Sequence, residues 1–388
     1  MTEQAFLPFA KPDIDQAAID EVVACLQSGW ITTGPRVNRF EQDLTAYLEA
    51  QQVLCVNSAT AGLHLALLCL NLQPGDEIIT TPLTFVATLN TIVQAGGIPV
   101  LVDVDLHTYN INVENIAAAI TPRTRGIVPV HYAGLPVDLD PIYQLAEQHQ
   151  LTVIEDCAHS IGAAYKGKRL GSFGHMQVFS FHPNKNMTTG EGGAISCPRP
   201  DWAAHISAMR FHGISKAAFD RFSKQGTQHY DVIAPGFKYN MLDMQAAIGI
   251  HQLPRLDSFI AARTRIAKRY LDAFADWPEL QLPQAPDYAH THAWHLFAPL
   301  INTTVAGMNR DEFMQRLKDM NIGTGLHYEA VHLHPFYQET YGFRPGDFPI
   351  AEDIGNRIVS LPLFPSLTES EQTRVIDSIA HVFAKELA

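Results

Sequence analysis

A lysine stands in an unusual loop near the middle of the sequence, in the stretch FSFHPNKNMTTGEGGAIS at positions 179–196. Lys185 is the only amine side chain in this stretch, and a run with Phe181 and Pro183 precedes it. An amine that is held on a stiff loop and partly removed from water has a lowered pKa and forms Schiff bases with carbonyl compounds. Most loop lysines are only solvated, so Lys185 indicates chemistry only together with other groups.

A carboxylate ends an earlier apolar run, in the segment TVIEDCAHS at positions 152–160. The common role of an aspartate at such a position, here Asp156, is to cap a helix or to pair with a surface cation. An alternative role is to keep a pyridinium nitrogen protonated, so that an aromatic cofactor ring can accept electrons. Asp156 by itself does not decide between these roles.

The segment NSATAGLHLALL at positions 57–68 predicts a helix that begins directly after a strand. Asn57 or Ser58 can cap this helix, and small residues and hydroxyls follow. A helix N-terminus with free N–H groups and hydroxyls binds phosphate, although capping alone explains the same residues equally well. A dinucleotide site is less favoured, because no GxGxxG pattern follows the first predicted strand.

These features lie in a region that predicts a largely parallel α/β sheet. Near-continuous apolar runs alternate with amphipathic helical patterns between about residues 50 and 200. The expected strands are 53-VLCV, 77-EIITT, 99-PVLVDV, 126-GIVPVHY, 152-TVIED, 177-QVFSF and 193-GAIS. Since ligands bind at the carboxyl ends of strands in such sheets, we expect the phosphate site, Asp156 and Lys185 to meet at one edge. Together they match the needs of pyridoxal phosphate.

A second, smaller unit is expected after the sheet. A long helical pattern over residues 243–274 is interrupted at Pro254, and the remaining sequence mixes helices with a few strands. We therefore predict a large cofactor-binding α/β domain over residues 1–254 and a small C-terminal α+β domain over residues 255–388.

The composition argues against several classes of function. The chain has 388 residues and a formal net charge of −13, with its acidic residues spread along the sequence. Nucleic acid and anionic membranes both favour basic patches, so neither is expected as a partner. No secretory signal is expected, and polar residues interrupt the apolar run at 53–72. Five cysteines without CxxC spacing are expected to be reduced thiols of a cytoplasmic protein.

Six stretches carry a resemblance to a known family. They are GWITTGP (29–35), NSATAGLHLAL (57–67), TPRTRGIVPVHYAG (121–134), IEDCAHSIGA (154–163), FSFHPNKNMTTGEGG (179–193) and PGFKYNMLDMQAAIG (235–249). On these motifs the chain resembles the DegT/DnrJ/EryC1/StrS family of pyridoxal-phosphate-dependent sugar aminotransferases over nearly its whole length. The resemblance implies fold type I of these enzymes, which is aspartate aminotransferase-like, with a mainly parallel seven-stranded sheet.

The activity that the resemblance implies is amino transfer from L-glutamate, with release of 2-oxoglutarate, to a keto group of a nucleotide-linked sugar. The stretches GWITTGP, GFKYN (236–240), HAWHLF (292–297) and GTGLH (323–327) favour a UDP-linked sugar aminated at C4, for a cell-surface polysaccharide or glycolipid. A dTDP- or GDP-linked sugar and amination at C3 stay open, as does a cofactor-binding regulatory homologue. The dehydratase branch of the family has His in place of the lysine, so Lys185 argues against it.

The resemblance also implies roles for residues around the cofactor. Lys185 would attach it and move the proton, Asp156 would pair with its ring nitrogen, and His159 would lie near its phenolic oxygen. His159 at a helix start can equally be a structural residue. Phe85 would stack on the ring, although an aromatic residue after a strand is more often part of a core. The phosphate would be held by Thr60, Ala61 and Ser180.

Further implied roles concern the substrate and a second subunit. Asn240 would reach the cofactor phosphate of the neighbouring subunit, which implies an obligate homodimer with shared active sites. Many relatives have Asn and Arg where this chain has Lys238 and Asn240, and Asn184 stands where relatives have an apolar residue. The nucleotide-linked sugar would be contacted by Trp30, Thr33, His327 and Tyr328. The histidines of 327-HYEAVHLHPFY lack a ligand-bearing frame, so no metal is expected.

Overall fold

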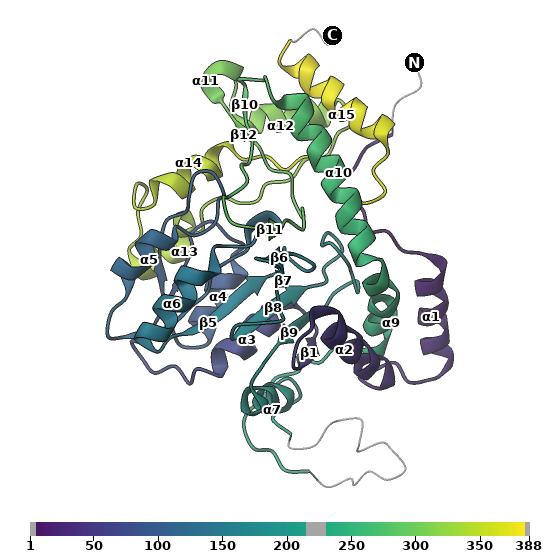
Figure 1. Ribbon diagram of the computed structural model, residues 1–388, viewed down its shortest axis with the longest axis vertical. Helices are drawn as coiled ribbons and strands as arrows, with labels where there is room; N and C mark the ends of the chain where they lie inside the picture. The colour runs from purple at the N-terminus through teal and green to yellow at the C-terminus, as the bar shows by residue number, and fades with distance from the viewer. Residues whose placement is uncertain (1–4, 215–229, 385–388) are drawn as a thin grey trace.

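A seven-stranded sheet forms the centre of the computed structural model, which describes residues 5–214 and 230–384 (Figure 1). In chain order the strands are β1 (Val53–Val56), β2 (Glu77–Thr80), β3 (Ile98–Leu101), β4 (Thr124–Ile127), β5 (Thr152–Cys157), β8 (Met176–Ser180) and β9 (Gly193–Ser196). Their spatial order is β1-β9-β8-β5-β4-β2-β3. β9 is antiparallel to both of its neighbours, and the other pairs are parallel. The mainly parallel seven-stranded sheet expected from the sequence is confirmed.

Helices cover both faces of this sheet (Figure 1). They are α1 (Gln16–Gln27), α2 (Pro35–Leu48), α3 (Ala59–Leu68), α4 (Ala87–Gln94), α5 (Val113–Ala119), α6 (Leu139–His149), α7 (Pro200–Met209) and α9 (Asp243–Gln252), with 3-10 turns η1 (Tyr132–Gly134) and η2 (Leu253–Arg255). Side chains alternate between the faces of a strand. In β1, Val53 and Cys55 accordingly join a core with Phe40 of α2, whereas Leu54 and Val56 join another with α3. Burial on both faces explains the near-continuous apolar runs in the sequence.

The C-terminal part of the chain builds a core of its own around α10 (Leu256–Phe274). The other elements here are β10 (Leu280–Gln281), β11 (His290–Thr291), β12 (Leu300–Ile301), α11 (Thr303–Ala306), α12 (Arg310–Asp319), η3 (Val331–Leu333), α13 (Pro335–Tyr341), α14 (Pro349–Arg357) and α15 (Glu369–Val382). β11 pairs with β6 (Ala164–Tyr165), which also pairs with β7 (Lys168–Arg169).

Helix α10 connects the two cores. Its first half packs Ile260 against the sheet core, and its second half packs Ile266 and Tyr270 into the C-terminal core. The interruption expected at Pro254 is present as η2, between α9 and α10. The predicted division into domains 1–254 and 255–388 stays a prediction.

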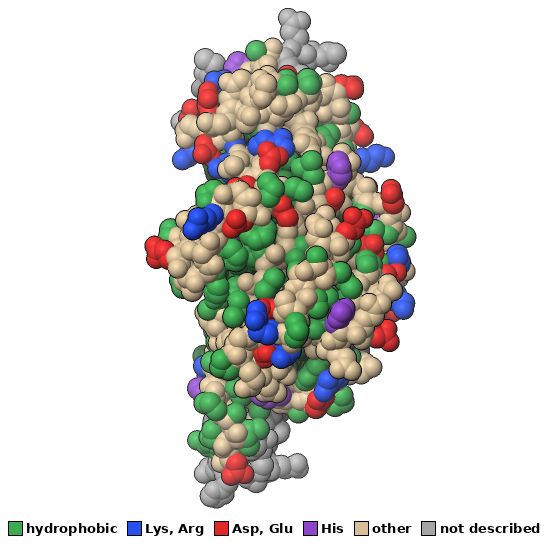
Figure 2. Space-filling model, turned by 90° about the vertical axis from the view of Figure 1, so that its left-hand side faces the viewer, with side chains coloured by type: hydrophobic (Ala, Val, Ile, Leu, Met, Phe, Trp, Pro, Cys, Tyr) green, Lys and Arg blue, Asp and Glu red, His purple; other side chains and the backbone are tan. Residues whose placement is uncertain are grey.

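The described surface carries charges of both signs. On the face shown in Figure 2, Lys and Arg side chains lie interspersed with Asp and Glu rather than gathered in one basic patch. Four of the five free cysteines are buried, namely Cys25, Cys55, Cys157 and Cys197. Among the described helices, none has both the length and the hydropathy that a membrane crossing requires.

Candidate active site

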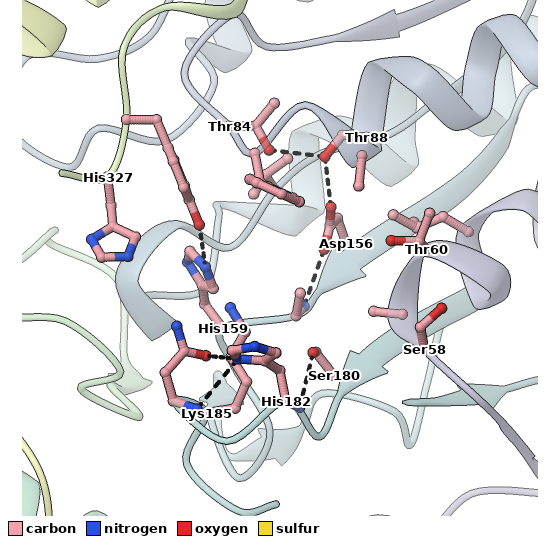
Figure 3. A pocket seen from close by; sticks show the side chains of 18 of the residues that line it. Ser58, Thr60, Thr84, Thr88, Asp156, His159, Ser180, His182, Lys185 and His327 are labelled. Carbon is pink, nitrogen blue, oxygen red and sulfur yellow. Dashed lines mark hydrogen bonds between the residues drawn. The ribbon is translucent and has the colours of Figure 1, made fainter. Parts of the chain in front are cut away.

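A cavity of about 450 Å³ opens at the carboxyl ends of β5 and β8 (Figure 3). The parallel pairing of these strands brings the residues that follow them to the same edge of the sheet. Most of the predicted site residues line this cavity, namely Thr60, Phe85, Asp156, His159, Ser180, Lys185, His327 and Tyr328. Thr60, Asp156, Ser180 and Lys185 therefore meet at one edge of the sheet, as expected for residues at the carboxyl ends of its strands.

The N-terminus of α3 forms one wall of the cavity. Ser58 is the N-cap, and its Oγ accepts a hydrogen bond of 3.1 Å from the Ala61 N–H. Ala61 does not line the cavity, so its predicted phosphate contact stays a prediction. The first amides of a helix have no intrahelical acceptor, so those of Ala59 and Thr60, which line the cavity, are free to bind a ligand. With the hydroxyls of Thr60 and Ser180, they form a donor set that suits a phosphate.

A glycine permits this wall to approach the sheet. A Cβ on Gly193 of β9 would lie 2.7 Å from both the Ala59 nitrogen and the Ser58 carbonyl carbon, and 2.8 Å from the Phe179 oxygen. These are backbone atoms that cannot turn aside. Only glycine therefore allows β9 to bring the helix start beside Ser180, which pairs with Gly193 in the sheet.

Asp156 lies buried at the floor of the cavity, and both of its carboxylate oxygens accept hydrogen bonds (Figure 3). Thr88 Oγ1 donates to Oδ2 at 2.8 Å, and the Ala158 N–H donates to Oδ1 at 3.1 Å. Burial raises the pKa of Asp156, whereas Thr88, Ala158 and the charge of Lys185 act to lower it. These donors favour the ionised carboxylate, which is the form that would hold a protonated ring nitrogen.

Lys185 reaches the cavity from a loop that is closed by its own hydrogen bonds. Phe181 is bonded through its N–H to the Gly192 oxygen at 2.9 Å and through its oxygen to the Thr189 N–H at 3.0 Å. The Asn186 side chain donates to the Ala293 oxygen at 2.6 Å. These bonds account for the stiffness that the sequence indicated. Burial lowers the pKa of Lys185 to about 8, against the opposing effect of Asp156.

His159 is held in one tautomer. The Ala133 N–H donates to its Nδ1 at 3.3 Å, so Nε2 carries the proton and donates to the Tyr328 hydroxyl at 2.9 Å. Burial holds the pKa of His159 well below its usual value, and Lys185 and His327 act in the same direction. His159 is therefore an uncharged donor that orients Tyr328.

The side chains at the mouth of the cavity are aromatic and polar. Phe85 is 56% exposed, and its ring lies 6.0 Å from that of Tyr328. On the loop side, His182 Nδ1 and Asn184 Oδ1 lie 2.7 Å apart. No role was predicted for Asn184 from the sequence, and in the structure it orients His182 at the rim of the cavity. The mouth combines a flat apolar surface with hydrogen-bonding groups, as a ligand with an aromatic ring requires.

The donor set fits pyridoxal phosphate. The start of α3 and Ser180 offer phosphate donors, Asp156 offers an ionised carboxylate, and Lys185 offers an amine with a lowered pKa. A model of the DegT/DnrJ/EryC1/StrS aminotransferase family matches residues 12–380. The chain belongs to this family. It is an enzyme of the pyridoxal-phosphate-dependent aminotransferase class, and its cofactor is pyridoxal phosphate.

Relatives of this DegT/DnrJ/EryC1/StrS family protein extend over its whole length. It is 45% identical over 385 residues to the uncharacterized protein MJ1066 of Methanocaldococcus jannaschii, with 99% of this chain and 100% of that protein covered. It is 43% identical over 378 residues to the spore coat polysaccharide biosynthesis protein SpsC of Bacillus subtilis, with 97% of each covered. The PLP form of Spr1654 from Streptococcus pneumoniae has a TM-score of 0.90 at 31% identity, covering 99% of this chain and 100% of that chain.

Three predicted site residues of this family member lie together outside the cavity of their own chain. Asn240 Nδ2 donates to Thr33 Oγ1 at 2.5 Å, and Trp30 Nε1 donates to the Thr33 oxygen at 3.1 Å. Asn240 also forms an antiparallel bridge with Val56 at the end of β1. The predicted contact of Asn240 with a neighbouring subunit's cofactor stays a prediction, as do the predicted contacts of Trp30 and Thr33 with the sugar.

The histidines of the 327–337 segment have separate partners. His327 Nδ1 lies 2.9 Å from Ser360 Oγ, and His332 Nε2 lies 2.9 Å from Glu352 Oε1. Burial lowers the pKa of His327 to about 3, with Lys185 acting in the same direction. These two histidines therefore serve different contacts.

Two residues at the site, Thr88 and His295, were not predicted from the sequence. Thr88 is the second residue of α4 and donates a hydrogen bond to Asp156. His295 lies on an irregular segment, with its Nε2 at 3.5 Å from Lys185 Nζ. The only signal for His295 was its place in the HAWHLF stretch, which was read for the substrate and not for a contact with Lys185.

Proposed function

We propose that this enzyme moves an amino group from L-glutamate to the C4 keto group of a UDP-linked sugar, for cell-surface polysaccharide or glycolipid synthesis. The observation that carries the proposal is the meeting of three features in one cavity. Lys185, the Asp156 carboxylate and the α3 N-terminus line the same space of about 450 Å³. An amine, a carboxylate and a phosphate cradle in this arrangement suit amino transfer.

Each group of the chain has a defined task in this reaction. Pyridoxal phosphate, when bound, supplies a ring that accepts the electrons released at the amino-bearing carbon. Asp156 Oδ1 or Oδ2 would hold the proton on the ring nitrogen, and Lys185 Nζ would be the point of attachment. Lys185 Nζ also takes the proton from the substrate carbon and returns it to another carbon, which its pKa of about 8 permits near neutral pH.

The remaining groups orient the ligand and limit its contact with water. His159 Nε2–H donates to the Tyr328 oxygen, so the Tyr328 hydroxyl proton is available to the cavity that it lines. Burial raises the pKa of Tyr328, which keeps this donor protonated. Phe85 at the mouth offers a face for stacking and shields the reacting atoms.

The sugar substrate is supported by relatives and by motifs. SpsC, at 43% identity, is named for spore coat polysaccharide biosynthesis. The stretches GWITTGP, GFKYN, HAWHLF and GTGLH resemble UDP-4-amino-4-deoxy-L-arabinose–oxoglutarate aminotransferase, which supports the UDP linkage and the C4 position. The free, buried cysteines agree with a reducing compartment, so we propose a cytoplasmic location.

The proposal includes a homodimer whose subunits share their active sites. Among the described residues that line the cavity, Lys185 is the one lysine or arginine, whereas a sugar diphosphate needs several cationic or polar donors. Asn240, Thr33 and Trp30 would be offered by the neighbouring chain. Helix α1 and the segment after it expose apolar side chains that a second copy would cover, namely Ile19, Val23, Leu26 and Ile31.

The substrate assignment is tested with a panel of keto sugars. The purified protein is loaded with pyridoxal phosphate, supplied with L-glutamate, and offered UDP-, dTDP- and GDP-linked sugars with keto groups at C3 or C4. Mass spectrometry then follows the amino sugar and 2-oxoglutarate. We expect the UDP-linked 4-keto sugar to be preferred. Preference for a 3-keto or dTDP-linked sugar would contradict the substrate assignment, and no amino sugar at all would contradict the function.

A further inference from the structure

His295 is a buried side chain in contact with the Lys185 amine. Its Nε2 lies 3.5 Å from Lys185 Nζ, and within the described residues this is the one hydrogen-bonding contact of that nitrogen. His295 is 1% exposed and does not line the cavity, so it lies behind the amine rather than beside the ligand. We propose that His295 is a positioning residue that aims the Lys185 amine into the cavity and favours its uncharged form. The inference rests on the proposed role of Lys185 as the attachment point.

The backbone fixes His295 in place. Its N–H donates to the Ala133 oxygen at 2.8 Å, and its own oxygen accepts from Arg263 Nη1 at 3.3 Å. Gly134, which follows Ala133, has a φ of +94°, and a Cβ there would lie 3.2 Å from the His295 nitrogen. The Ala133 N–H also donates to His159 Nδ1, so the same turn of the chain holds the positions of both histidines. The backbone of His295 cannot shift away from Lys185 without disturbing this turn.

The tautomers of His295 distinguish the two charge states of the lysine. Its Nδ1 is buried and has no hydrogen-bond partner among the described residues. An ammonium group has only donors, so it requires the lone pair at Nε2 and leaves a buried Nδ1–H without an acceptor. An uncharged amine can instead accept from Nε2–H, which leaves only a lone pair unsatisfied. A buried N–H without an acceptor is the rarer and costlier arrangement, so His295 favours the uncharged amine.

Burial and the neighbouring cationic groups keep His295 itself uncharged. Burial holds its pKa well below the usual value, and Lys185, His159, Arg263 and His327 act in the same direction. The rings of His159 and His295 lie 4.4 Å apart, so a charge on one opposes a charge on the other. Facing the Lys185 amine, Asp156 is the acidic group that favours its charged form. Asp156 therefore favours the charged form of the Lys185 amine, whereas the uncharged His295 favours its uncharged form.

The test measures the protonation of Lys185 directly. The full-length chain without cofactor is treated at a series of pH values with a trace of an amine-acylating reagent, and the peptide that contains Lys185 is quantified by mass spectrometry. The wild-type midpoint is expected near pH 8. In His295→Gln, the carboxamide oxygen can turn toward an ammonium group, so the midpoint should rise by about one pH unit.

The matched control is His292→Gln. His292 is a second histidine of the same segment, partly buried where His295 is fully buried, and its Nδ1 accepts from the Trp294 N–H at 2.9 Å. This variant should disturb the segment but leave the Lys185 midpoint within about 0.3 pH units, well below the shift of one unit. An unchanged or lowered midpoint in His295→Gln would overturn the proposal, as would an equal rise in both variants. Circular dichroism verifies that each variant is folded.

The readout is independent of amino transfer. If the His295→Gln shift is found but the wild type aminates no sugar, the proposed function fails while the contact between His295 and Lys185 stands. If amino sugars form but the midpoint does not move, the inference about His295 fails alone.

Discussion

Asp156 is buried and Lys185 is partly buried, and the surroundings of these two ionisable side chains favour different protonation states. Burial works against both charges, since it raises the pKa of Asp156 and lowers that of Lys185. Asp156 accepts hydrogen bonds from Thr88 and Ala158, which favour its charge. Lys185 has its contact with His295, an uncharged ring. The hydrogen bonds therefore support an ionised carboxylate beside an amine that readily loses its proton.

Thr88→Val is expected to make Asp156 harder to ionise. The substitution removes one donor to the carboxylate, so the pKa of Asp156 should rise further, by about one unit for the loss of a hydrogen bond to a charged group. The reaction needs the ionised form, and its rate falls as the pH drops through this pKa. The acid limb of the pH–rate profile should consequently move to higher pH, as measured by steady-state turnover of glutamate.

Thr84→Val is the control for that measurement. Thr84 Oγ1 lies 2.9 Å from Thr88 Oγ1 and has no bond to the carboxylate, so its loss should move the acid limb less. Equal shifts in the two variants, or none in Thr88→Val, would contradict the role given to Thr88.

The site residues that could be predicted from the sequence are those at strand ends. Asp156 and Ser180 lie at the ends of predicted strands and Lys185 follows one, and parallel pairing of β5 with β8 brings them together. Thr88 could not be predicted, because its bond to Asp156 joins residues 68 positions apart and depends on where α4 packs. His295 lies between β11 and β12, where no periodic pattern marks the chain.

At the scale of elements, the contact between β9 and the start of α3 decides whether a phosphate site exists. The strand and the helix meet where Gly193 faces Ala59 and Ser58. A larger side chain at this position has no free space, because the nearest atoms belong to the backbone. The amides that the helix offers to a phosphate therefore depend on a residue outside the helix.

Gly193→Ala should accordingly weaken both the fold and cofactor binding. The added methyl group would displace the α3 N-terminus, at a cost of about 1–3 kcal/mol in the free energy of unfolding. Cofactor affinity should fall by about tenfold or more, because the Ala59 and Thr60 amides would no longer point at one position. Denaturant unfolding and cofactor titration measure the two effects.

Gly97→Ala provides the comparison for Gly193→Ala. A Cβ on Gly97 would meet the side-chain ends of Leu72 at 3.0 Å and Ile92 at 3.2 Å, far from the site. These atoms can shift, so we expect a smaller cost and unchanged cofactor affinity. If Gly193→Ala also binds the cofactor normally, the close approach is not what builds the phosphate site.

The seven strands of the sheet were predictable because each lies in or beside a run of mostly buried apolar residues, although β4 itself includes the exposed Arg125. The two-residue strands β6, β7, β10, β11 and β12 were not, since two residues are too few for any pattern. The sequence also did not indicate that β9 runs antiparallel to its neighbours. A tight connection from β8 through the Lys185 loop returns the chain in the opposite direction, and only the fold reveals this.

At the scale of the whole molecule, the proposed homodimer would complete the active site with residues of a second chain. Asn240, Trp30 and Thr33 lie together but outside the cavity of their own chain. Each would need a second copy to reach a ligand. Residues that are clustered, largely polar and remote from their own cavity are what a shared active site would require.

Mixed dimers test this arrangement. Lys185→Ala and Asn240→Ala should each be nearly inactive at limiting cofactor. If one site takes its lysine from one chain and its asparagine from the other, a mixed dimer has one intact site and one doubly altered site. Random exchange of the two chains should then restore about one quarter of wild-type turnover. Activity no greater than the sum of the separate variants would contradict sharing.

The central claim is that Lys185 is the amine that carries the cofactor. The direct measurement is to load the wild-type chain with pyridoxal phosphate, reduce it with borohydride, digest it and locate the added mass by peptide sequencing. We predict one adduct, on Lys185, that L-glutamate added before reduction diminishes. An adduct on another lysine, or none on the peptide that contains Lys185, would contradict the account.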